Sequence, residues 1–358
     1  MNGAREAGPT SQARPSAAPP VLKAHPPTTH ARVLGMGAYR PERVVTNDEI
    51  CEHIDSSDEW IRKRSGIATR RFARPDETVI DMSEIACREA LQKAGVGVEQ
   101  IDVVLLATVT HPYQTPAAAP MLADRLGLPA PAAFDISAAC AGYCYGIGLA
   151  NDMIRSGSAR HVLVVGVEKL SDFTDPKDRG SAFIFGDGAG AAVVGPSDYP
   201  GISPTIWGSD GKNWDKIAQR EPWTDLREAM ESPGRPEGIH WPSIGMQGQA
   251  VFRWAVYSMA PVARQTLAAA GVSADELSAF VPHQANLRIT NSMVKELQLP
   301  DHVQVARDIV ETGNTSAASV PLAMTRLLDE DPDLSGTLAL QLGFGAGLAY
   351  AGQVVILP

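Results

Sequence analysis

Residues 133–168, AFDISAACAGYCYGIGLANDMIRSGSARHVLVVGVE, decide the fold class because one helical segment separates two apolar segments that are typical of strands. The first strand is expected at 133–137, the helix from Cys140 to about Ser156, and the second strand at 161–168. A helix between two strands is the βαβ unit, whose strands run parallel within a buried sheet. The stretch therefore predicts a layered α/β core.

Strands and helices continue to alternate on both sides of this stretch. One helix has a clear start and stop, because Thr78 and Asp81 are placed for a capping box and Gly95 for the end. The other strands are expected at 31–41, 101–110, 277–282, 302–306, 337–344 and 348–357, and the other helices near 116–127, at 250–271, from about 284, and at 315–328. Each half of the chain thus shows a similar succession of elements, although no sequence repeat is visible.

The composition divides the chain into four segments. Residues 1–30 are rich in Pro, Ala, Ser and Thr and are expected to be a disordered extension, with an organellar transit peptide as the alternative. Residues 31–205 and 246–358 are expected to form the N-terminal and C-terminal halves of the fold. Between them, residues 206–245 break the alternation with Gly, Pro, Asp and scattered Trp, which predicts a linker or an excursion loop.

Charge and composition exclude several classes of protein. A net charge of −10 argues against a nucleic-acid binder, which needs a basic face. No run of about 18 apolar residues is present, so no membrane span is expected. The four cysteines are too few for a disulfide scaffold and show no zinc-ligand spacing, so we expect no metal and a reducing, cytoplasmic location.

Three chemically versatile side chains lie at junctions between elements. Cys140 follows a strand at the start of a helix, where backbone N–H groups and the helix dipole favour a thiolate. His283 follows the strand at 277–282, and Asn314 precedes the helix at 315–328. Taken one at a time they have ordinary alternatives: an inert buried cysteine, a core or surface histidine, and a helix N-cap.

A glycine-rich turn, LGFGAGLAYAG at 342–352, separates the two terminal strands. Its glycines permit close approach of the backbone, so its N–H groups can join that of Cys140 in an oxyanion hole for a thioester carbonyl. A plain hairpin turn is the alternative interpretation.

These residues together resemble the β-ketoacyl-acyl carrier protein synthase III family, of the thiolase fold. The resemblance runs from about residue 31 to the end and rests on the motifs SSDEWIRKRSGI, SAACAGY, DRGSAFIFGDGAGA, VPHQANLRI, GNTSAAS and GFGAGLAYA, in the family's order. It implies a thiolase-like fold with two similar βαβαβ halves in a layered αβαβα arrangement. It also implies a homodimer.

The resemblance implies a catalytic Cys140, His283 and Asn314, with the backbone N–H groups of Cys140 and Ala346 as the oxyanion hole. Cys140 would take an acyl group from acyl-coenzyme A, and the acyl-enzyme would condense with malonyl-acyl carrier protein as CO2 is lost. His283 and Asn314 would hold the enolate oxygen. Acyl-coenzyme A is then a substrate, and no cofactor is needed.

Further roles follow from the same resemblance. It implies coenzyme A binding by Trp60, Arg64, Arg179 and Asn286, an acyl-pocket floor at Thr115, and carrier-protein docking by Arg253, Arg288 and Lys295. A small residue at position 115 predicts tolerance of primers longer than acetyl.

Three alternatives remain open from the sequence. A papain-like protease also uses Cys, His and Asn in this chain order, but the alternating elements do not suit that fold. A related condensing enzyme or acyltransferase could prime a polyketide or other specialised pathway, and release of CO2 from malonyl-carrier protein would separate condensation from simple transfer. A scaffold without activity would have no use for the site.

Overall fold

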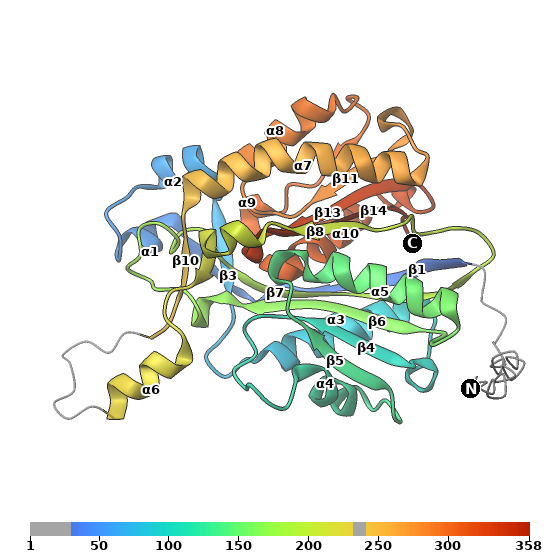
Figure 1. Cartoon of the computed structure of the whole chain (residues 1–358), viewed down its shortest axis with the longest axis horizontal. Helices are drawn as coiled ribbons and strands as arrows, with labels where there is room; N and C mark the ends of the chain where they lie inside the picture. Colours follow the sequence, from blue (N-terminus) through green and yellow to red (C-terminus); the bar gives the residue numbers. More distant parts are fainter. Residues whose placement is uncertain (1–29, 232–240) are drawn as a thin grey trace, which may run out of the picture.

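The computed structural model describes residues 30–231 and 241–358 of the 358-residue chain. The extension predicted at residues 1–30 lies outside the described residues apart from His30, where the first strand begins. Two five-stranded sheets dominate the described part of the chain, and layers of helices cover and separate them (Figure 1). The α/β class and the layered αβαβα arrangement expected from the sequence are both confirmed.

The first sheet belongs to the N-terminal half and is largely buried. Its strands lie in the order β1 (His30–Tyr39), β7 (Asp187–Ser197), β6 (Val162–Lys169), β4 (Val103–Ala107) and β5 (Ala132–Ile136). β4, β5 and β6 are parallel, whereas β7 runs antiparallel to both β6 and β1. Every residue of β4 and β6 is buried, as expected for strands with helices on both faces.

The second sheet has the same design. Its strands lie in the order β8 (Ile206–Ser209), β14 (Ala349–Ile356), β13 (Leu338–Phe344), β11 (Ala279–Pro282) and β12 (Gln304–Val305). β11, β12 and β13 are parallel, and β14 is antiparallel to β13 and β8. These directions repeat those of the first sheet strand for strand, so the two similar halves predicted from the order of elements are present.

Six helices form the three helical layers. α3 (Val79–Ala94) and α4 (Ala118–Leu126) cover the outer face of the first sheet, α5 (Gly142–Ser156) and α10 (Ser319–Glu330) lie between the sheets, and α7 (Gly248–Ala270) and α8 (Leu287–Leu297) cover the second sheet (Figure 1). The capping box of Thr78 with Asp81 and the left-handed Gly95 bound α3 as predicted. None of the helices in the described ranges is both long and apolar enough to cross a lipid bilayer.

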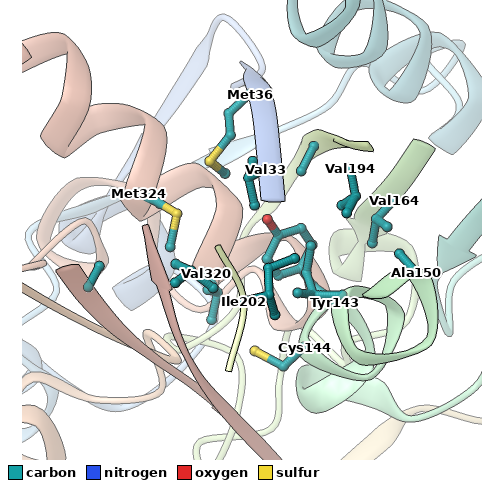
Figure 2. Packing of buried hydrophobic residues seen from close by; sticks show 14 of the residues in the cluster. Val33, Met36, Tyr143, Cys144, Ala150, Val164, Val194, Ile202, Val320 and Met324 are labelled. Atoms are coloured by element: carbon teal, nitrogen blue, oxygen red, sulfur yellow. The ribbon is translucent and has the colours of Figure 1, made fainter. Parts of the chain in front are cut away.

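The central layer joins the two sheets through one continuous core. Tyr143 and Cys144 of α5 and Val320 and Met324 of α10 pack among valines of the first sheet (Figure 2). Cys144 is therefore a packing residue. Close contact requires small residues in the strands: a Cβ on Gly190 of β7 would lie 2.7 Å from Pro321 of α10.

The remaining elements are short. The helices are α1 (Asn47–Cys51), α2 (Asp58–Ser65), α6 (Trp223–Glu231) and α9 (Ile309–Thr312), and the paired strands are β2 (Arg43–Thr46) with β3 (Thr69–Phe72) and β9 (Ile217–Gln219) with β10 (Ile244–Met246). The 3-10 helices are η1 (Val98–Gln100), η2 (Ala139–Ala141), η3 (Leu170–Asp172), η4 (Gly211–Lys216), η5 (Ala274–Glu276), η6 (Ser316–Ala318), η7 (Pro332–Leu334) and η8 (Ala346–Leu348).

The segment predicted as a linker at 206–245 differs from that prediction at its start. β8 pairs with β14 and is the first strand of the second sheet, in the place that β1 has in the first sheet. Its four residues are too few for a clear pattern, and Trp207 is exposed because β8 is an edge strand. The rest is an excursion, of which α6 extends away from the layered body (Figure 1).

Candidate active site

Cys140 lies between the end of β5 and the start of α5. It is the middle residue of η2, which leads directly into α5. The preceding residue, Ala139, has a φ of +44°, a region that residues with a side chain rarely adopt. Such strain persists only where the surroundings hold the backbone, so the position of the Cys140 sulfur is fixed by the fold.

His283 follows the last residue of β11 and is buried. Its backbone N–H donates to Leu342 O at 2.7 Å, which ties it to the adjacent β13. Its Nδ1 lies 2.6 Å from the Ser319 hydroxyl, which also accepts the Gln284 N–H at 3.3 Å. This pairing favours a Ser319 hydrogen directed at Nδ1, and hence a His283 tautomer that carries its own hydrogen on Nε2.

The imidazole of His283 is a neutral group. Burial lowers its pKa to about 3, so the ring carries no charge at neutral pH. The ring of Phe344 meets it edge to face, with centroids 5.3 Å apart. His283 is therefore suited to donate a hydrogen bond from Nε2 rather than to act as a cation.

Asn314 lies in the turn between α9 and η6. Its backbone N–H donates to Ile184 O at 2.9 Å and its carbonyl accepts the Gly186 N–H at 3.0 Å, so it bridges the two halves of the fold. The side-chain Oδ1 accepts the Ser316 N–H at 2.8 Å. Because the oxygen is engaged, the NH2 group is the part of the side chain that can act as a donor in the cavity.

The turn between β13 and β14 lies against Cys140. A Cβ placed on Gly345 would lie 2.6 Å from both Cβ and Sγ of Cys140, so this position has room for glycine alone. The backbone N–H groups of Ala346 and of Cys140 itself lie close enough to the sulfur to lower the pKa of its thiol. Two backbone donors therefore lie beside the sulfur.

The ionisation of Cys140 differs from the expectation drawn from its place at a helix start. Burial raises the pKa of its thiol to about 11, and the negative charge of Glu168 adds to the rise. The neighbouring Ser316 hydroxyl and the Ala346 and Cys140 N–H groups lower the pKa of the thiol but do not offset the burial. The thiol is the resting form, and the nucleophile must lose a proton as it reacts.

A cavity of about 700 Å³ brings together most of the candidate residues. Its inner part is lined by Cys140, His283, Asn314 and Ala346, and its outer part by Trp60, Arg64, Arg179, Arg253, Asn286 and Arg288. The three inner side chains are buried and the outer arginines are exposed, so the cavity runs from the surface to the sulfur. Residues from stretches of chain more than a hundred positions apart thus share one site.

The cavity mouth carries an aromatic side chain next to a cation. The guanidinium of Arg179 lies 5.3 Å from the centre of the Trp60 ring and is held by a 2.6 Å hydrogen bond to Asp55 O. Trp60 also meets Phe183 edge to face, yet it keeps 36% of its surface exposed. A planar ring that displaced Arg179 from this face of Trp60 would stack on the indole and could meet the guanidinium on its other side.

Asn286 is engaged in the protein itself. Its Oδ1 accepts the Arg288 N–H at the start of α8, and its Nδ2 donates to Arg64 O at 3.2 Å. The guanidinium of Arg288 covers Phe252 at 5.0 Å. Asn286 therefore joins α2 to α8 at the mouth. A ligand can use only the hydrogen-bonding positions of its amide that these two bonds leave open.

Two predicted site residues do not line the cavity. Lys295 is exposed on α8, beyond the rim. Thr115 is exposed in the loop between β4 and α4, so the chain by itself does not place Thr115 at the floor of an acyl pocket. The reason is that this loop runs outward, as the 61% exposed Tyr113 indicates.

The chain has relatives among known protein families, curated proteins and solved structures. Residues 134–211 match the model of 3-oxoacyl-[acyl-carrier-protein] synthase III, and residues 267–357 match the model of the C-terminal part of the same enzymes. The protein named beta-ketoacyl-[acyl-carrier-protein] synthase III 1 from Streptomyces coelicolor is 58% identical over 332 residues, which cover 92% of this chain and 97% of that protein.

The chain belongs to the 3-oxoacyl-[acyl-carrier-protein] synthase III family. Its relative from Kocuria rhizophila, a beta-ketoacyl-[acyl-carrier-protein] synthase III, is 53% identical over 94% of this chain and 99% of its own length. The priming beta-ketosynthase of the R1128 polyketide pathway superposes with a TM-score of 0.89 at 48% identity, over 95% of this chain and 99% of that chain. The synthase III of Aquifex aeolicus superposes with a TM-score of 0.82 at 36% identity, over 91% of this chain and 99% of that chain.

This member of the synthase III family is an acyl-transferring condensing enzyme with the thiolase-like fold. Three residues beside its candidate site were absent from the sequence interpretation: Ser316, Ser319 and Glu168. The GNTSAAS motif contains both serines, but their partners lie on β6 and directly after β11 and become neighbours only through the fold. The excursion was also missed as a wall of the cavity, to which it contributes Ile217, Ala218, Gln219 and Ile244.

Proposed function

We propose that this chain condenses the acyl group of an acyl-coenzyme A with malonyl-acyl carrier protein and releases β-ketoacyl-acyl carrier protein, CO2 and coenzyme A, the first condensation of fatty acid synthesis. The observation that supports the proposal is the single cavity lined by the exposed Trp60–Arg179 pair and by the buried side chains of Cys140, His283 and Asn314.

The first half-reaction takes place at Cys140. Its sulfur attacks the thioester carbonyl as the thiol proton leaves, and the negative charge that develops on the carbonyl oxygen is held by the N–H groups of Cys140 and Ala346. The carbon–sulfur bond to coenzyme A then breaks, coenzyme A leaves with a proton, and an acyl-Cys140 thioester remains. The adenine ring of coenzyme A is proposed to stack on Trp60, with Arg179 moved outward to the other face of the adenine, and Arg64 suits its phosphates.

The second half-reaction uses the two neutral donors. When malonyl-acyl carrier protein loses CO2, the bonding electrons form an enolate whose oxygen needs hydrogen-bond donors. His283 Nε2–H and the Asn314 NH2 group supply them without bringing a charge into the site. The enolate carbon then attacks the acyl-Cys140 carbonyl, and the Cys140 sulfur leaves. Neither half-reaction calls for a cofactor, because acyl-coenzyme A enters as a substrate.

Docking of the carrier protein is proposed at the basic rim. Carrier proteins of this class are acidic, and the chain has a net charge of −10, so attraction must come from a local patch. Arg253 and Arg288 line the outer cavity and Lys295 follows on the same helix as Arg288.

A homodimer is proposed from the edge of the first sheet. β5 pairs with β4 alone in the described part of the chain, and its Phe134 is 39% exposed. An edge strand with an exposed aromatic residue is a surface that a second copy can cover. Phe134→Glu should lower the mass in solution from dimer to monomer, whereas Tyr257→Glu, at a 76% exposed position on α7, should not.

A second candidate is the priming of a polyketide pathway. It is favoured by the 48% identity and TM-score of 0.89 with the priming beta-ketosynthase of the R1128 pathway. The two candidates share the chemistry and differ in the carrier protein. Relative rates with fatty-acid and polyketide carrier proteins, each loaded with malonyl, separate them.

The test of the proposed function is formation of the carbon–carbon bond. We expect the purified chain, given an acyl-coenzyme A and malonyl-acyl carrier protein, to yield CO2 and a carrier protein whose mass fits a β-ketoacyl group. Cys140→Ala should form no product, and Asn314→Ala should be acylated but condense poorly. Acyl transfer without CO2 release would contradict the proposal.

A further inference from the structure

Glu168 is a buried carboxylate that the two half-reactions leave unused. It lies near the end of β6 and has no exposed surface. No basic side chain of the described residues forms an ion pair with it. A buried charge without a counter-ion is costly, so its presence beside Cys140 needs a reason.

The hydrogen bonds divide the two oxygens of Glu168. Oε2 accepts three: from the Thr110 hydroxyl at 2.7 Å, the Val109 N–H at 3.1 Å and the Thr108 hydroxyl at 3.2 Å. Oε1 accepts one, from the Ser316 hydroxyl at 3.1 Å. Oε2 is therefore saturated, and Oε1 is the oxygen with room for a proton.

Ser316 lies between Glu168 and the sulfur. Its hydroxyl lowers the pKa of the neighbouring Cys140 thiol, and both residues line the same cavity. Its backbone is held at a φ of +47°, with its N–H bonded to Asn314 Oδ1. The strained backbone at Ala139, next to Cys140, and at Ser316 indicates that the fold fixes both residues in place.

We propose that Glu168 accepts, through Ser316, the proton that leaves Cys140 during acylation; this inference rests on the proposed function. As the sulfur bonds to the thioester carbon, its S–H bond breaks and the proton passes to Ser316 Oγ. The proton already on Ser316 passes to Glu168 Oε1. Ser316 ends as a hydroxyl, Glu168 as a neutral acid, and the proton on Glu168 is then given up to the departing coenzyme A thiolate.

The transfer keeps one negative charge in the buried site. A thiolate formed beside an ionised Glu168 would place two negative charges together, and that repulsion is one cause of the raised pKa of Cys140. Passing the proton to Glu168 moves the charge from carboxylate to sulfur without adding a second one. His283 is less suited to accept it, because burial lowers its pKa to about 3 and its Nδ1 is engaged by Ser319.

Glu168 faces mainly groups that do not titrate in the range of the experiment. They are the hydroxyls of Thr108, Thr110 and Ser316 and the Val109 N–H, and Cys140 is the titratable group coupled to it. The adjacent Lys169 directs its ammonium to Arg74 O and to the Asp172 carboxylate. Burial raises the pKa of Glu168 to about 7, so the carboxylate needed as acceptor is present above that pH.

The test measures acylation of Cys140 in a single turnover across pH 5.5 to 9.5. The substrate is whichever of acetyl-, butyryl- or isobutyryl-coenzyme A the wild type accepts fastest, and the product is the acylated protein, followed by mass. In the wild type we expect a rate that rises up to about pH 7 and then levels. Glu168→Gln should be about 10²-fold slower at pH 7.5. Its rate should keep rising tenfold per pH unit, because only solvent then removes the proton.

The sign of the effect separates this role from a structural one. If Glu168 were only a negative neighbour of Cys140, its neutralisation would lower the pKa of Cys140 and speed acylation. A Glu168→Gln rate equal to or above the wild-type rate therefore overturns the proposal. Ser316→Ala should lose as much as Glu168→Gln, with no further loss in the double variant. If Glu168→Gln does not fold, Ser316→Ala provides the test, and acylation of Ser316→Ala at the wild-type rate overturns the proposal.

Asp187→Asn is the matched control. Asp187 is a second buried carboxylate in the same sheet, and its oxygens accept hydrogen bonds from Ala73 and Ser171, away from Cys140. Its removal should leave the pH profile of acylation unchanged. A wild type that no acyl-coenzyme A acylates would contradict the proposed function itself, whereas equal acylation of wild type and Glu168→Gln contradicts this inference alone.

Discussion

The sulfur of Cys140 is surrounded by groups with opposite effects on its charge. Burial and Glu168 disfavour the thiolate, while the backbone donors and Ser316 favour it. The same backbone donors that only partly stabilise a thiolate at rest are placed to stabilise an acyl oxygen in the transition state. Reactivity therefore depends on how the proton leaves and on the geometry of the turn at Gly345.

Gly345→Ala tests the geometry of this turn. The new Cβ would lie 2.6 Å from the Cys140 sulfur, and the turn would have to move away with the Ala346 N–H. Loss of one oxyanion donor lowers turnover by about 10²–10³-fold, so we expect a loss of that size in the rate of acylation. Gly211→Ala is the control, because nothing lies within 4 Å of the added Cβ. Unimpaired acylation in Gly345→Ala would exclude the turn from the site.

Ser319→Ala tests how His283 is oriented. Without the hydroxyl at 2.6 Å from Nδ1, the ring loses the partner that favours hydrogen on Nε2. We expect condensation to slow about tenfold, a smaller loss than removing the donor itself, while Cys140 acylation is unchanged. Ser319→Thr keeps the hydroxyl and should restore most of the rate. Equal slowing of both half-reactions would show that the effect is structural.

The residue scale also separates what sequence can predict from what it cannot. Position at junctions between elements singled out Cys140, His283 and Asn314, and the family resemblance implied that they share a site. The structure places all three on one cavity. Glu168 was not predictable, because it looks like one more residue of a buried strand. The prediction of a thiolate at Cys140 was wrong for a related reason. Burial raises the pKa of the thiol, and burial depends on the whole fold, which the start of a helix does not reveal.

At the scale of elements, β1 and α3 approach each other so closely that glycine is required between them. A Cβ on Gly37 of β1 would lie 2.1 Å from the carbonyl oxygen of Ala86 in α3. This oxygen belongs to the helix backbone, so it can move away from the added Cβ only if the helix itself moves. Gly37 therefore allows the helix of the outer layer to pack closely against β1.

Gly37→Ala should accordingly destabilise the protein. Overpacking of this kind costs about 1–3 kcal/mol, measured as the free energy of unfolding in denaturant. Gly97→Ala is a control at the same distance of 2.1 Å, since the atom that its Cβ meets is the end of the flexible Glu99 side chain. Equal stabilities of the two variants would contradict the packing argument.

The excursion shows where prediction of elements fails. Strands such as β4 and β6 are continuous apolar runs, and their positions followed from the sequence. β8 alternates exposed and half-buried residues at a sheet edge, and β9 and β10 have three residues each. Such short pairs are specified by contacts with the rest of the fold, here as a wall of the cavity, rather than by local pattern.

At the scale of the whole molecule, buried titratable groups link stability to pH. The pKa of His283 falls on folding from its ordinary 6.5 to about 3, so below pH 6.5 the unfolded chain binds a proton that the folded one does not. Its contribution to stability is therefore lost as the pH falls from 6.5 toward 3. Glu168 and Asp187 act in the opposite direction, because burial raises their pKa values to about 7 and about 6.

His283→Asn isolates this contribution. The wild type should lose up to about 1.4 kcal/mol per pH unit below pH 6.5 through His283, and the variant should lack that part of the slope. The measurement is the free energy of unfolding of both proteins between pH 4.5 and 8. His53→Asn, at an exposed position, should keep the wild-type slope. Parallel curves for wild type and His283→Asn would contradict a buried neutral imidazole.

The central claim is that one cavity holds a covalent acyl intermediate and then discharges it to malonyl-acyl carrier protein. The most direct measurement is mass mapping of peptides after mixing with acyl-coenzyme A, before and after malonyl-acyl carrier protein is added. We predict one acyl group, on Cys140, that disappears as the carrier protein gains a β-ketoacyl mass. An acyl group on any other residue, or one that stays on Cys140 after the addition, would contradict the account.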